Sequence, residues 1–550
     1  MTVHGPTTRL AIAALSLFLA HPRAIPQSRE AASQTRGPVF VPLDSWIYPV
    51  LTRLAALGYI PDQAAGLRPW TRQECIRQLG EAETGWVADR GPSQREAARL
   101  ITALRREFEG ESQFSSGPYV ELDSLYLRTL AISGQPLVDG YNFGQTIVND
   151  FNRPSGEGAN VAAGFTAEGG AGRFSFYTRS EFQRSAPFAS PAAALAPGDN
   201  QVVPVLIGAP GGITRFQPLE MYAGVQLGKW ALTVGQQDLW WGPGEAGPLS
   251  FSDNAAPILM FRLTSASPLA LPGLLRRLGV FRVDVAGGEL SGHHLPRRPL
   301  MNAQKLTWNV TADLELGFTR WSLFDGSGVH GFTAGSVFRN LFANGATFGH
   351  AADPGDRKSG FDFRWRPPLP GRFLTLYADL YADDEPTPLA SPRRSAFSPG
   401  IYVPRLPGLS HWDLRVEAPS TRGADKDRGG QFFYWNNVYQ DANTNDGGLL
   451  GDWVGRDGRG LFVQAAYWRS PRSHFEFTWR QNRIGAAFLP GGGTQDDAGV
   501  RGILRAGPGW SISAFAQYER YSIPLLGGRK SDLAASVEIF YTPKWRLSRN

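Results

Sequence analysis

The chain has 550 residues and a formal net charge of +6, with 64 glycines, one cysteine and an aromatic share of 12%. A single cysteine excludes a framework of internal disulfides, and the positive charge is spread without a basic block, which argues against a nucleic-acid partner. After the first 24 residues no apolar run reaches about 18 residues, so the sequence contains no helical membrane span.

The first 24 residues have the pattern of a secretory signal peptide. Arg9 precedes an apolar core, Leu10–Ala20, that is too short to span a membrane. Small residues at Ala20 and Ala24 both permit cleavage, and the sequence leaves the choice between them open. We therefore expect a secreted chain that begins with a polar linker over residues 25–41.

Residues 42–114 carry the helical periodicity of the chain and predict a bundle of about three short helices. In the first helix the apolar residues recur at helical spacing from Ile47 to Leu57, and Gly58 follows as a stop. Such helices can bury their apolar stripes on one another or on the mouth of a barrel.

Two further helix starts are predicted from capping boxes. Thr71 with Glu74, and Ser93 with Glu96, have the three-residue spacing at which a hydroxyl and a carboxylate satisfy the first backbone amides of a helix. Cys75 lies just inside the first of these helices. A packed side chain is the expected role for a free cysteine in such a position.

From residue 115 to 550 the chain alternates apolar and polar side chains with a period of two. In the segment 173–182, for example, Phe174 and Phe176 share one face of a strand, whereas Arg179 and Glu181 share the other. A soluble barrel would turn the apolar face inward, and a membrane barrel would turn it outward. The local pattern is the same in both cases.

The connections between these strands favour the membrane barrel. Short turns such as 228–229 and 470–473 mostly alternate with long loops along the chain, as in bacterial outer-membrane barrels. The long loops are predicted at 184–217, 237–256, 288–304, 325–360, 382–410, 441–460 and 482–498. The sequence therefore predicts an all-β transmembrane β-barrel of about 18 antiparallel strands.

The pattern yields 19 candidate strands, and an even number is expected when both ends of a barrel lie on one side. We expect segment 119–131 to be the surplus one, packing with the helices instead. The last strand, 533–541, alternates its apolar residues outward.

Two groups of side chains should mark the two faces of the wall. Tryptophans at strand ends are expected in interfacial girdles, namely Trp230, Trp365, Trp412, Trp468 and Trp479. Charged residues on the opposite face are expected to form ion-pair ladders in the lumen, namely Asp362, Arg364, Arg366, Arg415, Glu417, Glu476 and Arg480.

The first candidate binding loop runs from residue 238 to 257. Trp240 and Trp241 offer flat faces for the C–H groups of sugars, and Asp253 and Asn254 supply directed hydrogen bonds. Two Gly-Pro steps restrain the loop, which lowers the ordering cost of binding. The alternative is that the loop folds into the lumen as a plug with its tryptophans packed.

The second candidate loop, 432–457, is a polar and aromatic surface suited to carbohydrate. Its candidate binding residues are Tyr434, Trp435, Asn437, Tyr439, Asp441 and Asn445. Asp441, Asn443, Asn445 and Asp452 also fall at positions 1, 3, 5 and 12 of a calcium loop, but position 6 is Asp446 rather than glycine. We therefore expect no metal here.

No arrangement of residues supports catalysis. His293 and His294 are adjacent, so on a strand they would face opposite ways, and no further metal ligands are evident. The segment G-A-P-G-G at 208–212 lacks the strand and helix that a phosphate loop needs. We expect neither a cofactor nor an enzyme activity.

Several stretches together resemble the Wzi family of outer-membrane capsule-assembly proteins. They are V-P-L-D-S-W-I-Y-P-V-L-T-R-L-A-A-L-G (41–58), P-W-T-R-Q-E (69–74), F-G-Q-T-I-V-N-D-F-N-R-P-S-G-E-G-A-N (143–160), R-S-E-F-Q-R-S-A-P (179–187), L-W-W-G-P-G-E-A-G-P-L-S-F-S-D-N-A-A-P (239–257) and N-N-V-Y-Q-D-A-N-T-N-D-G-G-L-L-G-D-W-V-G-R-D-G (436–458). They occur in the expected order from residue 41 to about 545. Ala442-Asn443 departs from the Gly-Tyr that the family more often shows.

The resemblance implies an 18-stranded barrel with a periplasmic helical bundle. It also implies a non-catalytic, lectin-like role in attaching or organising capsular or other exported polysaccharide at the cell surface. The partners would be that polysaccharide and outer-membrane lipid, with contact to export machinery left open, and we expect a monomer. A porin-like channel for small solutes or saccharides is the main alternative, and a barrel enzyme acting on lipid or glycan is the third.

Overall fold

The fold was analysed on a computed structural model of the chain. The structure describes residues 37–89, 91–109, 117–188, 191–195, 202–206, 211–327, 333, 335, 355–369, 373–383, 387–389, 392–423, 433–436, 438–543 and 545–548. The predicted signal peptide and most of the predicted linker lie outside these residues.

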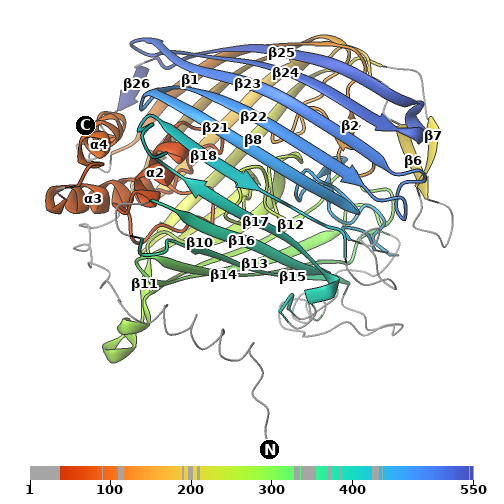
Figure 1. Ribbon diagram of the computed structural model, residues 1–550. Helices are drawn as coiled ribbons and strands as arrows, with labels where there is room; N and C mark the ends of the chain where they lie inside the picture. Colours follow the sequence, from red (N-terminus) through yellow and green to blue (C-terminus); the bar gives the residue numbers. More distant parts are fainter. Residues whose placement is uncertain are drawn as a thin grey trace, which may run out of the picture.

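The described residues form a closed antiparallel β-barrel with three helices at one end (Figure 1). Its sheet contains 20 strands, of which β11 (Leu269–Ala270) and β26 (Trp545–Ser548) are short edge pieces. The other 18 form the wall, as predicted. They are β1 (Tyr119–Ser133), β4 (Gly158–Ala171), β5 (Phe174–Arg184), β8 (Thr214–Leu227), β9 (Trp230–Gln237), β10 (Ile258–Ser265), β12 (Val280–Glu289), β13 (Leu300–Thr311), β14 (Leu314–Phe324), β15 (Asp356–Trp365), β16 (Thr375–Asp383), β17 (Ser395–Val403), β18 (Trp412–Glu417), β21 (Gly458–Ser470), β22 (Ser473–Ile484), β23 (Gly493–Gly507), β24 (Trp510–Ile523) and β25 (Gly528–Tyr541).

Segment 119–131 is part of the wall, and the prediction that it packs with the helices was wrong. It lies in β1, which pairs with β4 on one side and with β25 and β26 on the other. This strand closes the barrel, so its backbone groups are satisfied by both neighbours and the sheet has no open edge. Its pairing with β25 and β26 joins residues 400 or more positions apart, which the local sequence pattern cannot reveal.

The exposed fractions of the side chains show which face of each strand points toward the membrane. On β5, Phe174 and Phe176 are 56% and 45% exposed, whereas Arg179 and Glu181 are 2% and 0% exposed. On β25 the outward positions Leu533, Val537 and Ile539 are likewise exposed, as predicted. The apolar face therefore points out and the charged face points into the lumen, which is the arrangement of a transmembrane barrel.

Most short turns lie at one end of the barrel and most long loops at the other; the exceptions are the long connection 266–279 at the short-turn end and the short connection 524–527 at the long-loop end. The first wall strand begins at Tyr119 and β26 ends at Ser548, both at the short-turn end, and the hairpin of β6 (Pro191–Leu195) and β7 (Val202–Leu206) lies at the long-loop end (Figure 1). The predicted loop 382–410 was wrong in part, because it contains β17. Pro399 and Gly400 interrupt its strand pattern, yet they pair with Ala378 and Tyr377 of β16.

The helices α2 (Ile47–Ala56), α3 (Arg72–Ala88) and α4 (Gln94–Phe108) lie at the short-turn end (Figure 1). Gly58 ends the first with a φ of +93°. The Thr71 hydroxyl caps α3 by accepting from the Glu74 amide at 3.1 Å, as predicted. Cys75 is buried among these helices.

The prediction of a second capping box was wrong. Ser93 precedes α4 but makes no side-chain cap, and its hydroxyl lies 2.9 Å from that of Tyr59. The Glu96 carboxylate instead accepts from Arg53 at 2.6 Å. In the described part of the chain, none of the helices is both long and apolar enough to cross a membrane.

The end of the predicted linker, residues 37–41, is buried in the barrel rather than solvated. Phe40 is 3% exposed, and its amide donates to the Tyr222 hydroxyl of β8 at 2.8 Å. The Ser175 hydroxyl of β5 donates to the Pro38 carbonyl at 2.6 Å. The chain therefore runs along the inner wall before it reaches the helices.

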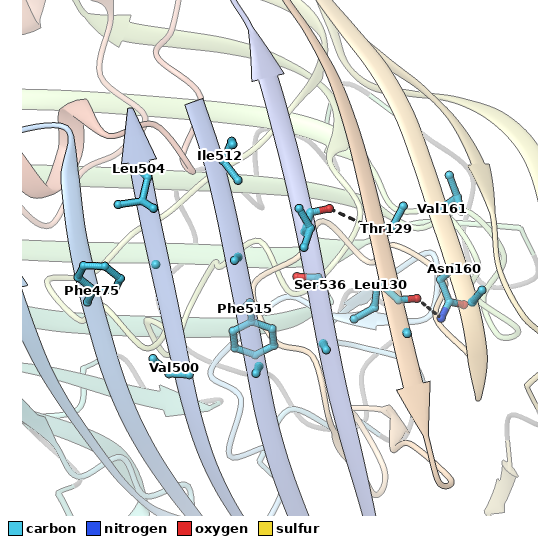
Figure 2. A pocket seen from close by; sticks show the side chains of 17 residues that line it. Thr129, Leu130, Asn160, Val161, Phe475, Val500, Leu504, Ile512, Phe515 and Ser536 are labelled. Carbon is cyan, nitrogen blue, oxygen red and sulfur yellow. Dashed lines mark hydrogen bonds between the residues drawn. The ribbon is translucent and has the colours of Figure 1, made fainter. Parts of the chain in front are cut away.

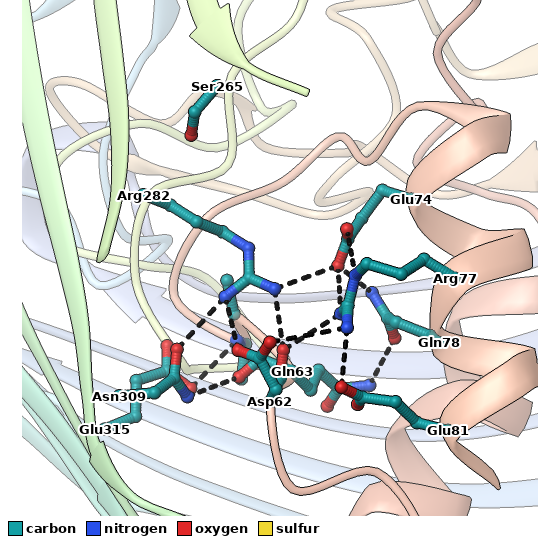
Figure 3. Close-up of polar contacts among 12 residues, drawn as sticks. Asp62, Gln63, Glu74, Arg77, Gln78, Glu81, Ser265, Arg282, Asn309 and Glu315 are labelled. Carbon is teal, nitrogen blue, oxygen red and sulfur yellow. Dashed lines mark hydrogen bonds and ion pairs between the residues drawn. The ribbon is translucent and has the colours of Figure 1, made fainter. Parts of the chain in front are cut away.

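A buried network of charges ties the helical segment to the wall (Figure 3). Arg282 of β12 donates to the Asp62 carboxylate at 3.0 Å and to the Glu74 carboxylate at 3.2 Å. Arg77 of α3 donates to Glu74 at 2.6 Å and to Glu81 at 2.7 Å. Both carboxylates that Arg282 contacts come from the helical segment, so this side chain links that segment to the barrel, as does the pair of Arg53 and Asp413 at 2.9 Å.

The other lumen charges form the predicted ion pairs, and one girdle tryptophan was placed on the wrong face. Arg366 pairs with Asp313 at 2.8 Å and Arg480 with Asp497 at 2.6 Å. Trp468 is 6% exposed, and its indole donates to Asp413 at 2.7 Å inside the barrel. It packs against α2 because the helices occupy this end of the lumen.

Candidate functional site

The loop 238–257 between β9 and β10 folds into the lumen and meets the N-terminal segment there. Trp240 and Arg68 exchange both backbone hydrogen bonds at 3.0 Å, and the Gly242 amide donates to the Gly66 carbonyl at 3.0 Å. The helical segment enters from the short-turn end and the loop from the other. The two meet as a miniature sheet, so they fill the lumen jointly.

Three carboxylates on the barrel wall hold this plug by its backbone. Glu315 of β14 accepts from the amides of residues 65 and 66 at 3.1 and 3.0 Å. Asp379 of β16 accepts from the Leu249 amide at 2.8 Å. Glu417 of β18 accepts from the amides of residues 245 and 246 at 2.8 and 2.9 Å. Carboxyl oxygens are good acceptors for backbone amides, so the wall fixes the position of both plug segments.

The two loops singled out from the sequence lie against each other. The Tyr434 hydroxyl donates to the Leu249 carbonyl at 2.7 Å, and the Ser252 amide donates to the Leu450 carbonyl at 2.5 Å. The Asn445 side chain donates to the Ala256 carbonyl at 2.8 Å. Loop 433–457 therefore forms the outer layer of the plug over loop 238–257.

Two more long-loop segments complete this layer, and sequence reasoning did not single them out as site elements. The Asn149 amide donates to the Asn254 side chain at 2.7 Å, and the Phe151 amide donates to the Asp253 carbonyl at 2.7 Å. The Ser291 amide donates to the Asn445 side chain at 2.7 Å. Positive φ angles at Asn149 and Phe151 mark the turn that brings 149–153 inward.

Trp240 and Trp241 are packed inside the plug. They are 6% and 0% exposed, and the Trp241 ring meets Phe251 edge-on at 5.3 Å between ring centroids. The Trp240 indole donates to the Gly244 carbonyl at 3.0 Å, which closes the first Gly-Pro turn. This geometry fits the plug alternative for the loop and leaves neither ring face open at the surface.

Asp253 and Asn254 are also buried, but they differ in how well their side-chain polar groups are hydrogen-bonded. The Asn254 amide group donates to Ser252 and to the Gly451 carbonyl. Asp253 is 4% exposed, and burial, followed by the nearby Asp44 and Asp150 carboxylates, raises its pKa to about 7 against the pull of Arg153. An acid with this pKa is protonated below neutral pH, about half protonated at pH 7 and charged above it.

Replacing Asp253 by asparagine is expected to stabilise the folded protein at pH 8 by roughly 1–3 kcal/mol. The folded state holds the proton more tightly than the unfolded chain between about pH 4 and pH 7. Wild-type stability should therefore fall as the pH rises through this window, whereas the variant should lack that part of the slope. Melting of the detergent-folded barrel from pH 4 to pH 8 measures both, and parallel curves would contradict the expectation.

The remaining candidates split between the plug and its outer edge. Tyr434, Tyr439 and Asn445 are 0%, 3% and 3% exposed, so they serve the packing of the plug. Trp435 and Asp441 are half-buried at the edge. Asn437 lies outside the described residues.

The outward edge of the plug carries a polar rim, defined here as His294, Trp435, Asn436, Asp441 and Asp446. The His294 ring is exposed, and its Nδ1 lies 3.2 Å from the Asp441 carboxylate, which also accepts the His294 amide at 2.8 Å. Asp446 lies 3.8 Å from Arg215 of β8. A ring, carboxylates and amides within one rim can recognise sugar hydroxyls.

The calcium and metal alternatives find no support in this geometry. Asp441 turns to His294, whereas Asp452 accepts from the Val454 amide at 3.1 Å. His293 is buried against the Thr444 carbonyl at 2.9 Å, and burial lowers its pKa. Within the described ranges no group of three or more His, Cys, Asp or Glu residues could hold a metal ion.

Comparison with known proteins identifies the family of the chain and supports its fold. A family model described as capsule assembly protein Wzi matches residues 128–533. Over 213 residues the chain is 28% identical to a Klebsiella pneumoniae protein described as an uncharacterized 55.8 kDa protein in the cps region. That match covers 38% of this chain and 41% of the relative, so the matched part spans about two-fifths of the relative's length.

Among solved structures, the fold is similar to an Escherichia coli outer-membrane protein, Wzi, described as involved in group 1 capsule assembly and as a carbohydrate-binding β-barrel. The TM-score is 0.65 at 17% identity, and the match covers 92% of this chain and 100% of that one. The likeness confirms the barrel architecture. With its family match over most of the wall, this chain belongs to the Wzi family of capsule assembly proteins and is a β-barrel of the outer membrane.

Proposed function

We propose that the protein is a non-catalytic, lectin-like barrel that retains capsular or other exported polysaccharide at the cell surface. In this proposal the long loops face outward and the helical bundle lies in the periplasm. The polymer binds at the polar rim, and many weak contacts along one chain add up to stable retention. The sequence offered two candidate loops, 238–257 and 432–457, and the burial of Trp240 and Trp241 moves the proposal to the rim.

The observation that carries this proposal is the interlocked plug beneath the rim. Four loop segments fix one another through backbone and side-chain hydrogen bonds, so the rim is held on a rigid base. A pre-organised surface loses little entropy when it binds a flexible polymer. The filled lumen also argues against the porin-like alternative in the residues that the structure describes.

Binding of purified, detergent-folded protein to the producing strain's surface polysaccharide tests the proposal. A variant combining His294→Ala, Trp435→Ala and Asp441→Ala is expected to bind about tenfold or more weakly, because stacking and hydrogen bonds at the rim are lost. Arg173→Ala, an exposed residue at the opposite end of the barrel, serves as the control and should bind like wild type.

A Trp240→Ala, Trp241→Ala variant separates the rim from the plug. This variant should lose affinity only because a poorly packed plug disturbs the rim above it. A loss of affinity larger than that of the rim variant would therefore move the site to loop 238–257. Equal binding by the rim variant and wild type would overturn the rim as the site. In cells, a deletion mutant that keeps all its capsule bound, with none shifted to the medium, would overturn retention itself.

A further inference from the structure

The outer surface of strands β21 to β25 changes from apolar to basic over three successive rows of outward side chains. Directly paired positions define each row across the five strands. The first row, nearest the middle of the wall, is Val463, Trp479, Ala498, Tyr518 and Leu533; the second is Leu461, Gln481, Asp496, Arg520 and Ser531; the third is Arg459, Arg483, Thr494, Ser522 and Arg529.

The first row belongs to the lipid-facing band. Trp479, Tyr518 and Leu533 are 39%, 52% and 51% exposed on the outside of the barrel. Aromatic rings at such positions mark the boundary between the hydrocarbon and the head groups. The third row lies four residues further toward the long-loop end on each strand, which is about 13 Å along the strand. It therefore lies beyond that boundary, at the level of the lipid head groups.

The third row, called here the arginine row, holds like charges side by side. Arg459 and Arg483 are direct cross-strand partners and both are exposed. Like charges in this position destabilise a sheet unless an anion lies between them. No carboxylate of the described residues lies within salt-bridge distance of Arg459, Arg483 or Arg529. Thr494 and Ser522 add hydroxyl donors between the arginines.

An apolar groove lies on the same outer face, nearer the short-turn end (Figure 2). Its volume is about 520 Å³, and small side chains on β24 and β25 form its floor between larger ones. The outward residues that line it include Val500, Ile512, Ala514, Ala516, Ala535 and Val537. On β24, Ala516 lies six residues from Ser522 of the arginine row, about 20 Å along the strand, and Arg520 lies between them. An acyl chain that runs from this groove toward the long-loop end would lead to the arginine row.

We propose that this face binds a phosphorylated glycolipid of the lipid A type, with its phosphates on the arginine row and one acyl chain in the groove. The row spans five strands, roughly 19 Å at the usual strand spacing, and carries three guanidinium groups. Two separated phosphates on one head group match this spacing better than the single phosphate of a common phospholipid. Arginine binds phosphate in a bidentate manner, which favours a fixed head-group position.

Native mass spectrometry of the detergent-folded barrel with defined lipids tests this site. Wild type should retain bisphosphoryl lipid A most strongly, with monophosphoryl lipid A and phosphatidylglycerol weaker. The variant Arg459→Gln, Arg483→Gln should bind bisphosphoryl lipid A at least tenfold more weakly. The matched control is Arg276→Gln, Arg277→Gln, a pair of neighbouring exposed arginines on the short helix η1 (Gly273–Leu278) at the opposite end, and it should bind like wild type.

A second variant tests the groove without touching a charge. Ala516→Phe, at an exposed position, fills the groove and should weaken lipid A binding while the barrel remains resistant to unfolding in detergent. Undiminished binding by the double arginine variant, or an equal loss in the control pair, would overturn the site. Equal retention of phosphatidylglycerol would overturn the lipid A assignment. A loss of acidic polysaccharide binding with lipid binding intact would reassign the row to the polymer.

Discussion

Replacing Arg282 by methionine is expected to loosen the attachment of the helical segment to the barrel. Arg282 is 3% exposed and is the wall residue that bonds both Asp62 and Glu74. Its loss leaves these two buried carboxylates with Arg77 as their remaining ion-pair partner. Breaking a buried ion pair by removing one partner costs about 3–5 kcal/mol, so opening of the segment should become about two to three orders of magnitude more frequent.

Hydrogen exchange of residues 72–108 measures this opening directly, since local unfolding appears there without loss of the barrel. Limited proteolysis within α3 and α4 gives an independent reading. Arg276→Met serves as the control, because Arg276 is exposed on η1 and bonds no residue of the helical segment. If the helices of the Arg282 variant exchange as slowly as those of wild type, Arg282 does not couple them to the wall.

Removing the two wall carboxylates that hold loop 238–257 is expected to open the barrel. Asp379→Ala combined with Glu417→Ala deletes the acceptors for the Leu249 amide and for the amides of residues 245 and 246. Each hydrogen bond to a charged group is worth about 1.5–3 kcal/mol. Their joint loss should let the loop leave the lumen for part of the time, and a charged, water-filled path would follow.

Planar-bilayer conductance reports this change. Wild type should show no steady open level, whereas the double variant should show discrete openings. Glu476→Ala is the matched control, since Glu476 also faces the lumen but bonds His474 rather than the plug. A steady large conductance of wild type would contradict the plug and return the channel alternative to first place. A silent double variant with a protected loop would show that other contacts suffice to hold it.

The period-two pattern was sufficient to predict the barrel, its connections and its charged ladders, because these depend on side chains that alternate along single strands. It missed β17, since Pro399 and Gly400 break the local pattern while the neighbours of the strand maintain the pairing. It also missed the closing role of β1, which depends on partners at the far end of the chain.

The candidate loops show the same limit of a local sequence pattern, which carries no information on distant partners. Trp240, Trp241 and Tyr434 were chosen because exposed aromatic rings suit sugars, and the fold instead buries them. Sequence could name the residue types but not their surroundings, since the rings pack on residues from three other parts of the chain. The rim residue His294 was considered only as a metal ligand beside His293, because its partner Asp441 is 147 positions away in the sequence.

The sequence by itself determined that the chain forms two-faced strands joined by alternating short and long connections, since local spacing is enough to specify side-chain alternation. Only the tertiary structure decided how the lumen is filled and which candidate residues are buried there. The N-terminal segment and the long loops pack together inside the wall because its carboxylates accept hydrogen bonds from their backbone amides. This packing buries Trp240 and Trp241 and leaves His294 at the rim.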